Sequence, residues 1–337
     1  GLAVLFLRWT AGLASGILPQ DRGESSVPAV RRAAVGRARA PEPWRSAVPY
    51  GDHARHVLDV YRPAVSGRCP VVYFVHGGGW NARSRTNVHD LLDVPLLLSH
   101  GIAVVAPDYR FIADAQAAGV EPPVRAPLED AARALQFTRF HAADWGLDPR
   151  RIAGSGGSAG ACSVLWLALH DDRARPDAPD PIARESTRLC FVAAAGAQTS
   201  LDPLQMREWI PNITYGAHAF GFAVARAEER AAAFERWLAA RDRLLPVIRE
   251  YSPIEHASAD DPPLWLYYGE TVQVAKGDAP ADPTHTSLFG LMLRERLGPL
   301  GVPVVVTTRA RPEGPHRTLT DALIASLTNT SARTSNP

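Results

Sequence analysis

The chain has 337 residues, of which 46% are hydrophobic and 21% are charged. These fractions are typical of a globular protein with a sizeable core, in one large domain or two ordinary ones. Its 36 basic and 35 acidic side chains give a formal net charge of +1, so no electrostatic argument favours binding to nucleic acid or to an anionic membrane.

Residues 1–43 are predicted to form an N-terminal extension. Their apolar start, GLAVLFLRWTAGLASGILPQ, is interrupted by Arg8 and is too short to span a bilayer. It fits either the remnant of a secretion signal or a disordered extension. The location therefore stays open between secreted or periplasmic and cytoplasmic. No other segment approaches the length of a membrane span, so no integral membrane association is expected.

Apolar segments with strand-like patterns begin near residue 56. HVLDVYRP (56–63) alternates and ends in proline, and PVVYFV (70–75) is a continuous run typical of a strand buried on both faces. Further strands are predicted at 101–109, 150–154, 189–197, 262–270 and 302–309. Helical spacing predicts helices at 87–99, 127–146, 159–170, 224–245, 287–301 and 318–327.

Strands alternating with helices indicate the α/β class, with a mostly parallel central sheet covered by helices on both faces. The main domain is predicted to span residues 44–326, followed by a flexible tail at 327–337. Residues 200–255 are too long for a simple crossover and are predicted to form a helical cap insertion. In such sheets the chemistry sits at the carboxyl ends of the strands.

The segment GGSAG (156–160) follows the strand predicted at 150–154 and matches the pattern G-x-S-x-G. This pattern is typical of a sharp strand-to-helix turn that exposes its serine, so Ser158 is the candidate nucleophile. A phosphate-binding loop would need a nearby lysine, which is missing here. A dinucleotide-binding turn fits only partly and belongs to the first βαβ unit, whereas this turn follows several strands.

A nucleophilic serine needs a base and an acid that orients it. Among the 11 histidines, His316 follows the last predicted strand and precedes the last helix, which gives the chain order serine, acid, histidine. His285 is the rival, but it lies close to the segment expected to carry the acid. That segment holds three candidates after the strand at 262–270: Asp278 and Asp282, which are preferred, and Glu270.

The glycines of HGGGW (76–80) follow the strand at 70–75. Their backbone N–H groups are free to point at a developing negative charge, as in an oxyanion hole, although a flexible turn would have the same sequence. The side chains that flank these glycines, His76 and Trp80, are candidate substrate-binding residues.

Taken in order, these segments resemble the α/β-hydrolase family, in its bacterial carboxylesterase branch with an HGGG oxyanion motif. The likeness covers residues 45–326 and rests on YGDHARHVLDVYRP, VYFVHGGGW, PDYRF, DPRRIAGSGGSAGA, the late acidic loop and GPH. Within this family, its motifs are most similar to those of feruloyl, acetyl-xylan and hormone-sensitive-lipase-like esterases. The roles implied by the resemblance are nucleophile for Ser158, general base for His316, orienting acid for Asp278 or Asp282, and oxyanion donors for Gly78, Gly79 and Ala159.

The resemblance implies hydrolysis of a small or carbohydrate-linked ester through an acyl-enzyme, without a metal or an organic cofactor. Two positions depart from the family pattern. Gly157 stands where hormone-sensitive-lipase relatives usually have an aspartate, and Val272 stands where the acid usually lies. Two alternatives stay open: an amide or formamide hydrolase of the arylformamidase type, and a catalytically silent binding protein. The oligomeric state is not determined.

Overall fold

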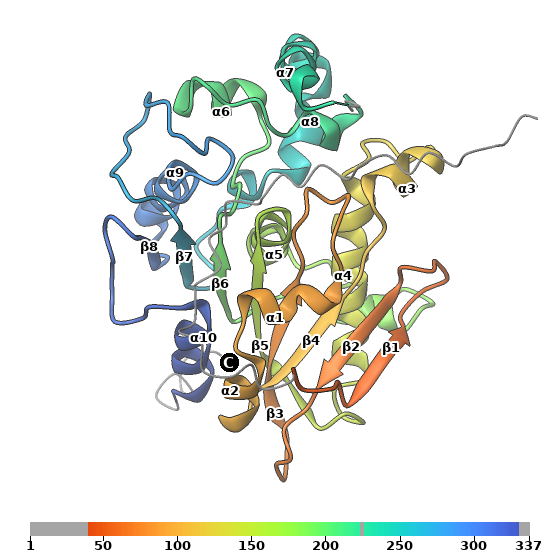
Figure 1. The fold of residues 1–337 in the computed structure, drawn as a ribbon. Coiled ribbons are helices and arrows are strands. Elements are labelled where there is room, and N and C mark those ends of the chain that lie inside the picture. Colours follow the sequence, from red (N-terminus) through yellow and green to blue (C-terminus); the bar gives the residue numbers. More distant parts are fainter. Residues whose placement is uncertain (1–39, 223–225, 330–337) are drawn as a thin grey trace, which may run out of the picture.

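A computed structural model describes residues 40–222 and 226–329 of the chain (Figure 1). Eight strands in these residues form one sheet. The strands are β1 Arg45–Pro49, β2 Val57–Tyr61, β3 Cys69–Val75, β4 Ala103–Pro107, β5 Leu147–Gly157, β6 Phe191–Ala195, β7 Leu264–Tyr268 and β8 Val304–Thr308. The α-helices are α1 Val88–Leu91, α2 Val94–Ser99, α3 Ile112–Ala117, α4 Arg125–Phe140, α5 Ala159–Leu169, α6 Pro203–Trp209, α7 Arg230–Ala239, α8 Arg241–Tyr251, α9 Leu288–Leu297 and α10 Leu319–Thr328.

The strand order is β1-β2-β4-β3-β5-β6-β7-β8. Only the β1–β2 and β2–β4 pairs are antiparallel, and the remaining pairs are parallel. The predicted mostly parallel sheet is therefore confirmed. Because β3, β5, β6 and β7 are neighbours, the segments that follow them meet at the same end of the sheet.

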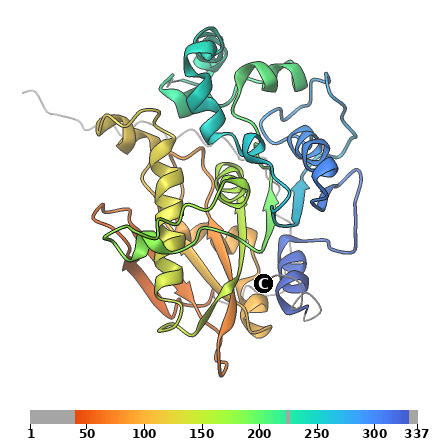
Figure 2. The same cartoon turned by 180° about the vertical axis from the view of Figure 1, so that it is seen from behind.

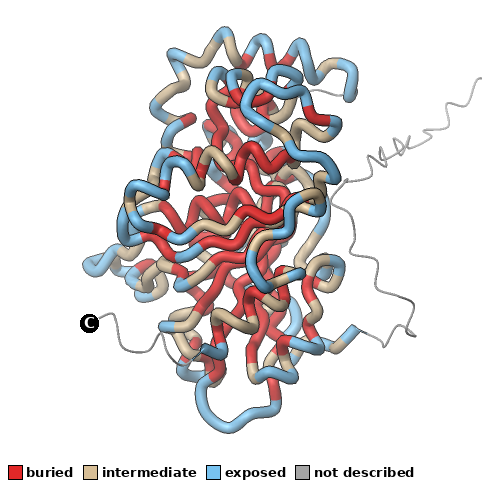
Figure 3. Tube along the Cα trace, turned by 90° about the vertical axis from the view of Figure 1, so that its left-hand side faces the viewer, coloured by how far each residue is buried: buried red, intermediate tan, exposed pale blue. Residues whose placement is uncertain are grey.

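Helices cover both faces of the sheet, as predicted. Alternate residues of β3 divide between two hydrophobic clusters: Val71 and Tyr73 pack with α4, α5 and α9, whereas Val72 and Phe74 pack with α1, α2 and α10. Figure 1 shows α1, α2 and α10 on the near side of the sheet, and Figure 2 shows α4 and α5 on the other. Buried residues run through the middle of the molecule between these layers (Figure 3).

Two predicted helices are each divided in the structure, and β1 and the short helices α3 and α6 are observed where no strand or helix was predicted. β1 was missed, because its sequence RSAVP is largely exposed and shows no alternation. The helix predicted at 87–99 is divided into α1 and α2, since Asp93 caps α2 by accepting a hydrogen bond from the Leu96 N–H. The helix predicted at 224–245 is likewise divided into α7 and α8 at Ala240.

The segment predicted as a cap, residues 200–255, carries α6, α7 and α8. These helices lie together beyond one end of the strands (Figures 1 and 2). Most of the predicted N-terminal extension (1–43) and tail (327–337) lies outside the described residues. Within the described ranges, none of the helices is long and apolar enough to cross a bilayer.

Candidate active site

Ser158 lies at the sharp turn between β5 and α5. Its backbone angles, φ 54° and ψ −124°, fall in a region that side chains other than glycine rarely adopt. Two hydrogen bonds hold this conformation: the Ser158 N–H donates to the Ala195 carbonyl at 2.8 Å, and the Cys162 N–H donates to the Ser158 carbonyl at 2.9 Å. The turn is thus the strained elbow that the sequence pattern indicates.

Two glycines around Ser158 are required by close backbone approach. A Cβ on Gly160 would lie 2.0 Å from the carbonyl oxygen of Val75, and a Cβ on Gly156 would lie 2.7 Å from the same oxygen. Real side chains essentially never approach backbone this closely, so only glycine lets the elbow pack against the end of β3.

The other two serines of this stretch are buried and have structural partners. Ser155 donates a hydrogen bond to the Ala193 carbonyl, and Ser163 donates to the Ala159 carbonyl while it accepts from the Trp80 indole. Ser158 is only partly buried, so it is the serine available to a substrate.

The histidine at Ser158 is His285. Its Nε2 lies 2.9 Å from the Ser158 Oγ, and its Nδ1 lies 2.9 Å from Asp282 Oδ2. Because a carboxylate only accepts hydrogen bonds, the neutral ring carries its proton on Nδ1 and presents the Nε2 lone pair to the serine hydroxyl. The three side chains therefore form a relay in which the serine proton has an acceptor.

The prediction of His316 at this place is contradicted by the structure. His316 lies between β8 and α10, and Figure 1 shows this connection running down the outside of the molecule towards α10. β8 is the third strand from β5, at a distance of about 14 Å for the usual strand spacing, whereas β7 is the second. The segment after β7 is long enough to return to the elbow, so it supplies the histidine.

Three contacts hold the segment after β7 over the elbow. His285 packs on Gly196, where a Cβ would lie 3.2 Å from the ring. The Gln198 amide donates to the Thr284 carbonyl at 2.6 Å, and the Glu270 carboxylate accepts from the Ser287 N–H at 2.9 Å. Hydrogen bonds to Thr284 and Ser287 therefore hold the backbone just before and just after His285.

The three predicted acids have different places in this segment. Asp282 contacts His285, and its Oδ1 also accepts hydrogen bonds from the N–H groups of Thr284 and His285 at 3.2 Å. Asp278 is exposed and accepts from the Ala275 N–H in a local turn, so it is not at the histidine. Glu270 has the anchoring contact described above.

The glycine segment after β3 runs beside the elbow. A Cβ on Gly77 would lie 2.5 Å from the Gly157 carbonyl and 3.4 Å from the Ser158 Cβ, so this backbone passes directly along the Ser158 turn. Gly78 and Gly79 have φ values of +96° and +59°. In the described part of the chain, their N–H groups donate no hydrogen bond to a backbone carbonyl. Ala159 begins α5, where a helix leaves its first N–H groups unpaired.

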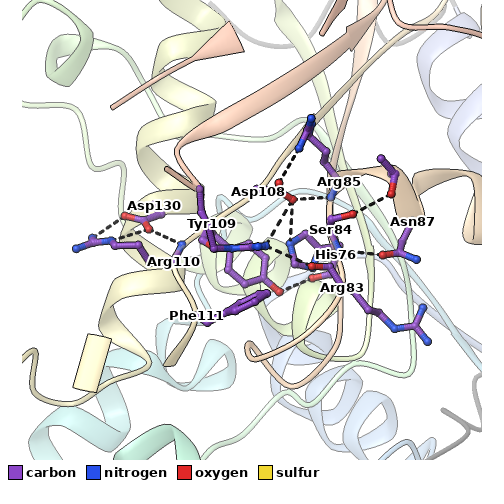
Figure 4. A network of polar contacts seen from close by, with 12 residues as sticks. His76, Arg83, Ser84, Arg85, Asn87, Asp108, Tyr109, Arg110, Phe111 and Asp130 are labelled. Atoms are coloured by element: carbon purple, nitrogen blue, oxygen red, sulfur yellow. Dashed lines mark hydrogen bonds and ion pairs between the residues drawn. The ribbon is translucent and has the colours of Figure 1, made fainter. Parts of the chain in front are cut away.

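A buried polar network supports this segment from below (Figure 4). The Tyr109 hydroxyl donates to the carbonyl of His76 at 2.8 Å, and the two rings stack with centroids 4.1 Å apart. Asp108 lies 3.6 Å from His76 Nε2 and binds Arg85 through its backbone N–H and its guanidinium. Asp108 and Tyr109 thus have a structural role beneath the glycine segment.

The prediction that His76 and Trp80 bind substrate is contradicted. Both side chains are fully buried, with 0% exposure. His76 lies beneath the glycine segment in the network of Figure 4, and the Trp80 indole donates to Ser163 at 3.0 Å. Both side chains pack beneath the glycine segment, where a ligand cannot reach them.

The segment between β6 and β7 contacts the glycine segment from above. His218 Nε2 lies 3.0 Å from the Gly79 carbonyl, to which it donates. The Tyr215 ring meets the His218 ring edge-on at 5.1 Å, and its hydroxyl is buried without a hydrogen-bond partner among the described residues. His218 was not singled out from the sequence, because nothing in its spacing distinguishes it from the other histidines of the chain.

Burial lowers the pKa of His218 to about 4, against the opposing effect of its hydrogen bond to Gly79, and burial likewise lowers the pKa of His76 to about 4. An imidazole in the unfolded chain has a pKa of about 6.5. Between these values the unfolded chain binds more protons than the folded one. Stability is therefore lost as the pH falls from about 6.5 to about 4 and levels off below that.

We expect His218→Gln to flatten this pH dependence, because glutamine can still donate to Gly79 but does not titrate. The variant should recover at most about 3 kcal/mol of the stability that the wild type loses between pH 6.5 and pH 4. Urea unfolding at several pH values measures the difference. His100→Gln, at an exposed histidine, is the control and should leave the slope unchanged. Equal slopes for wild type and His218→Gln would contradict the assignment.

A cavity of about 220 Å³ borders His285. Its walls come from β7, from the segment that follows it and from the end of β6, and they include Tyr267, Val272, Val274 and Asp282. The cavity thus borders the acid and the histidine of the relay.

Comparison with known families gives one match that covers most of the chain. The model of the BD-FAE family matches residues 58–277. This range includes the glycine segment and the elbow, and it ends before Asp282 and His285.

The relatives and solved structures that the chain resembles are named as ester hydrolases. The chain is 27% identical over 296 residues to the probable carboxylic ester hydrolase LipM of Mycobacterium tuberculosis, covering 80% of this chain and 61% of LipM. It is 36% identical over 119 residues to the carboxylesterase NlhH of the same organism, covering 34% of each chain. The match thus spans about three fifths of the length of LipM.

Two solved structures share the fold. One is an acetyl ester-xyloside bifunctional hydrolase from Caldicellulosiruptor lactoaceticus, with a TM-score of 0.54 and 22% identity over 79% of this chain and 80% of that one. The other is a truncated carbohydrate esterase from gut microbiota, with a TM-score of 0.59 and 16% identity over 85% of this chain and 96% of that one.

Proposed function

Because the chain belongs to the BD-FAE family of α/β-hydrolases, we propose that it hydrolyses carboxylic esters, with Ser158 as nucleophile, His285 as general base and Asp282 as the acid that orients the base. The observation that carries the proposal is the relay at the strained elbow, with 2.9 Å from Ser158 Oγ to His285 Nε2 and 2.9 Å from His285 Nδ1 to Asp282. These distances are those of a nucleophile within reach of its base.

In the proposed reaction, the Ser158 oxygen attacks the ester carbonyl while its proton moves to His285 Nε2. The resulting imidazolium is stabilised by Asp282, and it gives its proton to the departing alcohol. Water then attacks the acyl-enzyme and loses a proton to the same Nε2. The bond from the acyl carbon to Ser158 Oγ breaks, Oγ takes the proton back from Nε2, and the acid is released. The ring keeps one orientation through both steps because Nδ1 stays bonded to Asp282.

The negative oxygen of each tetrahedral intermediate would be held by the N–H groups of Gly78, Gly79 and Ala159. Two observations support this role of the N–H groups. Gly78 and Gly79 have positive φ values, and Ala159 lies at the start of α5, where the helix dipole favours negative charge. Loss of one such donor costs roughly 10²–10³ in turnover in serine hydrolases.

The proposed substrate class is a small or carbohydrate-linked ester. It is supported by the acetyl ester-xyloside hydrolase and the carbohydrate esterase that share the fold. The segment above Gly79, with Tyr215 and His218, would lie over the reacting group. Rates on p-nitrophenyl esters of increasing acyl length, and on acetylated and feruloylated sugars, would define the class.

The proposal is tested by covalent labelling and by hydrolysis. A fluorophosphonate probe is expected to modify one residue, Ser158, identified by peptide mass spectrometry, and the protein should hydrolyse p-nitrophenyl acetate. A matched N-formyl anilide should react much more slowly. Faster reaction of the anilide would indicate an amide hydrolase instead, and absence of both labelling and hydrolysis would indicate a binding protein.

We expect Asp282→Asn to lower kcat by about 10⁴, because an amide can donate to Nδ1 and so favours the wrong tautomer of His285. Asp278→Asn, in the same segment but away from the histidine, is the matched control and should stay within about twofold of wild type. Steady-state kinetics on p-nitrophenyl acetate measure both, with circular dichroism to confirm folding. Equal losses in the two variants would contradict the role of Asp282.

A further inference from the structure

A second cluster of reactive side chains lies away from Ser158. His170, Glu250 and His256 each offer one potential metal ligand, and these atoms lie within 4.8 Å of one another. Over residues 40–222 and 226–329, no other group of three His, Cys, Asp or Glu side chains meets this spacing. All three residues are partly buried.

The protons of His170 make this cluster unusual. Its Nδ1 lies 3.0 Å from the carbonyl oxygen of Asp171, and its Nε2 lies 3.2 Å from Glu250 Oε1. Both oxygens only accept hydrogen bonds, and a neutral imidazole has only one N–H. A neutral ring would therefore set a lone pair against one of these oxygens. The contact is favourable only with a second proton on the ring or with a cation between the two atoms.

His256 completes the cluster from the other side. Its Nε2 lies 2.7 Å from the backbone carbonyl of Glu250, to which it donates, so Nδ1 is the unprotonated nitrogen of the neutral ring. The His170 and His256 rings lie 4.2 Å apart. Metal-binding histidines usually donate their other N–H to a carbonyl or carboxylate, which fixes the ring and raises its basicity. Both histidines have that arrangement.

The surrounding backbone also favours a positive charge. His170 follows the last residue of α5, and Glu250 lies in the last turn of α8, so the carboxyl ends of two helices meet at the cluster. Each helix end carries a partial negative charge that stabilises a cation.

One cation already lies nearby. Arg173 Nη1 is 3.7 Å from Glu250 Oε1, and the same guanidinium lies over the Trp166 ring. A separation of 3.7 Å is too long for a hydrogen bond. Arg173 therefore leaves the carboxylate with capacity to bind a further partner.

We propose that His170, Glu250 and His256 bind one zinc-type divalent cation. Two imidazoles and a carboxylate are a typical zinc donor set. Tetrahedral zinc at its usual bond lengths holds such donors about 3.3 Å apart, so the side chains need to close by roughly 1.5 Å.

The site would join the core to the segment between β6 and β7. α5 begins beside Ser158 and ends at His170, whereas Glu250 and His256 belong to α8 and the turn at Pro253–His256 that follows it. The cation would act as a cross-link at the far end of the nucleophile helix and takes no part in ester hydrolysis. The inference does not depend on the proposed function.

The test is titration of the chelator-treated full chain with Zn²⁺ in competition with a chromophoric chelator. We expect one equivalent to bind per chain. His170→Ala and His256→Ala should each weaken the affinity by about 100-fold, and Glu250→Gln by at least tenfold. His100→Ala, at an exposed histidine outside the cluster, should bind as the wild type does.

Thermal unfolding gives an independent readout. Zn²⁺ at a hundredfold excess over its Kd should raise the wild-type Tm by roughly 5–10 °C, and it should leave the Tm of the His170→Ala/His256→Ala double variant unchanged. The Tm values without Zn²⁺ show whether each variant folds.

Three results would overturn the proposal. The first is failure of the wild type to bind one equivalent of Zn²⁺, which would leave His170 and Glu250 as an ion pair of the protonated ring. The second is equal affinity of wild type and the double variant. The third is loss of binding in His285→Ala, which would place the ion at the candidate active site. The first result decides even if every cluster variant fails to fold.

Discussion

Ser158→Ala is expected to lower kcat for p-nitrophenyl acetate by about 10⁶, to a residual rate that reflects substrate binding and the oxyanion donors alone. Alanine keeps the Cβ and therefore the same backbone strain at φ 54°, so the fold should be retained. Fluorophosphonate labelling should disappear together with the activity. Stopped assays with high enzyme concentration measure the residual rate.

Ser155→Ala is the matched control for this change. Ser155 is three residues earlier, and its buried hydroxyl donates to the Ala193 carbonyl. Its loss should lower the free energy of unfolding by about 1 kcal/mol and leave kcat within about twofold. Retention of full hydrolysis by Ser158→Ala would show that the elbow is not the nucleophile and would refute the proposed mechanism.

His285→Ala is expected to have an effect of the same size, a loss of about 10⁶ in kcat, because the serine proton then has no acceptor. His316→Ala should retain kcat within about twofold. The two substitutions remove the same side chain from loops that follow neighbouring strands, so each is the control for the other. Kinetics of both variants at the same pH compare them directly.

The opposite result would be equally clear. Loss of activity in His316→Ala with retention in His285→Ala would return the base to the place that chain order favours, and it would require the segment after β7 to leave the elbow in solution. Intermediate losses in both would indicate that each histidine reaches Ser158 in part of the population.

The fold was largely predictable because its pattern is local. Continuous apolar runs such as 70–75 and 101–109 identify buried parallel strands, and helices of regular spacing alternate with them. The elements that were missed or misplaced lack that pattern. β1 pairs along one edge only and is largely exposed, and the breaks at Asp93 and Ala240 depend on capping and on contacts with neighbouring helices.

The elbow was predictable for the same reason. Its strain, its glycines and its serine lie within five consecutive residues, and the contacts that require Gly156 and Gly160 are with the adjacent strand. The glycine segment lies beside it because β3 and β5 are neighbours in the sheet. The side chains of His76 and Trp80 were misjudged, since burial beneath a loop has no sequence signature.

Sequence alone thus determined the class of fold, the elbow that presents Ser158 and the acidic segment that reaches it. Only the tertiary structure decided which histidine meets Ser158. The return of residues 269–287 over the elbow depends on contacts with Gly196 and Gln198, which follow β6, and on the contact between Glu270 and Ser287 within the segment itself. It also brought together His170, Glu250 and His256, of which two lie 80 or more residues from the first and share no spacing that predicts a site. A turn or a strand can be predicted from consecutive residues, because its pattern is local. Contacts made by long loops depend on how distant parts of the chain pack together, so the sequence pattern does not predict them.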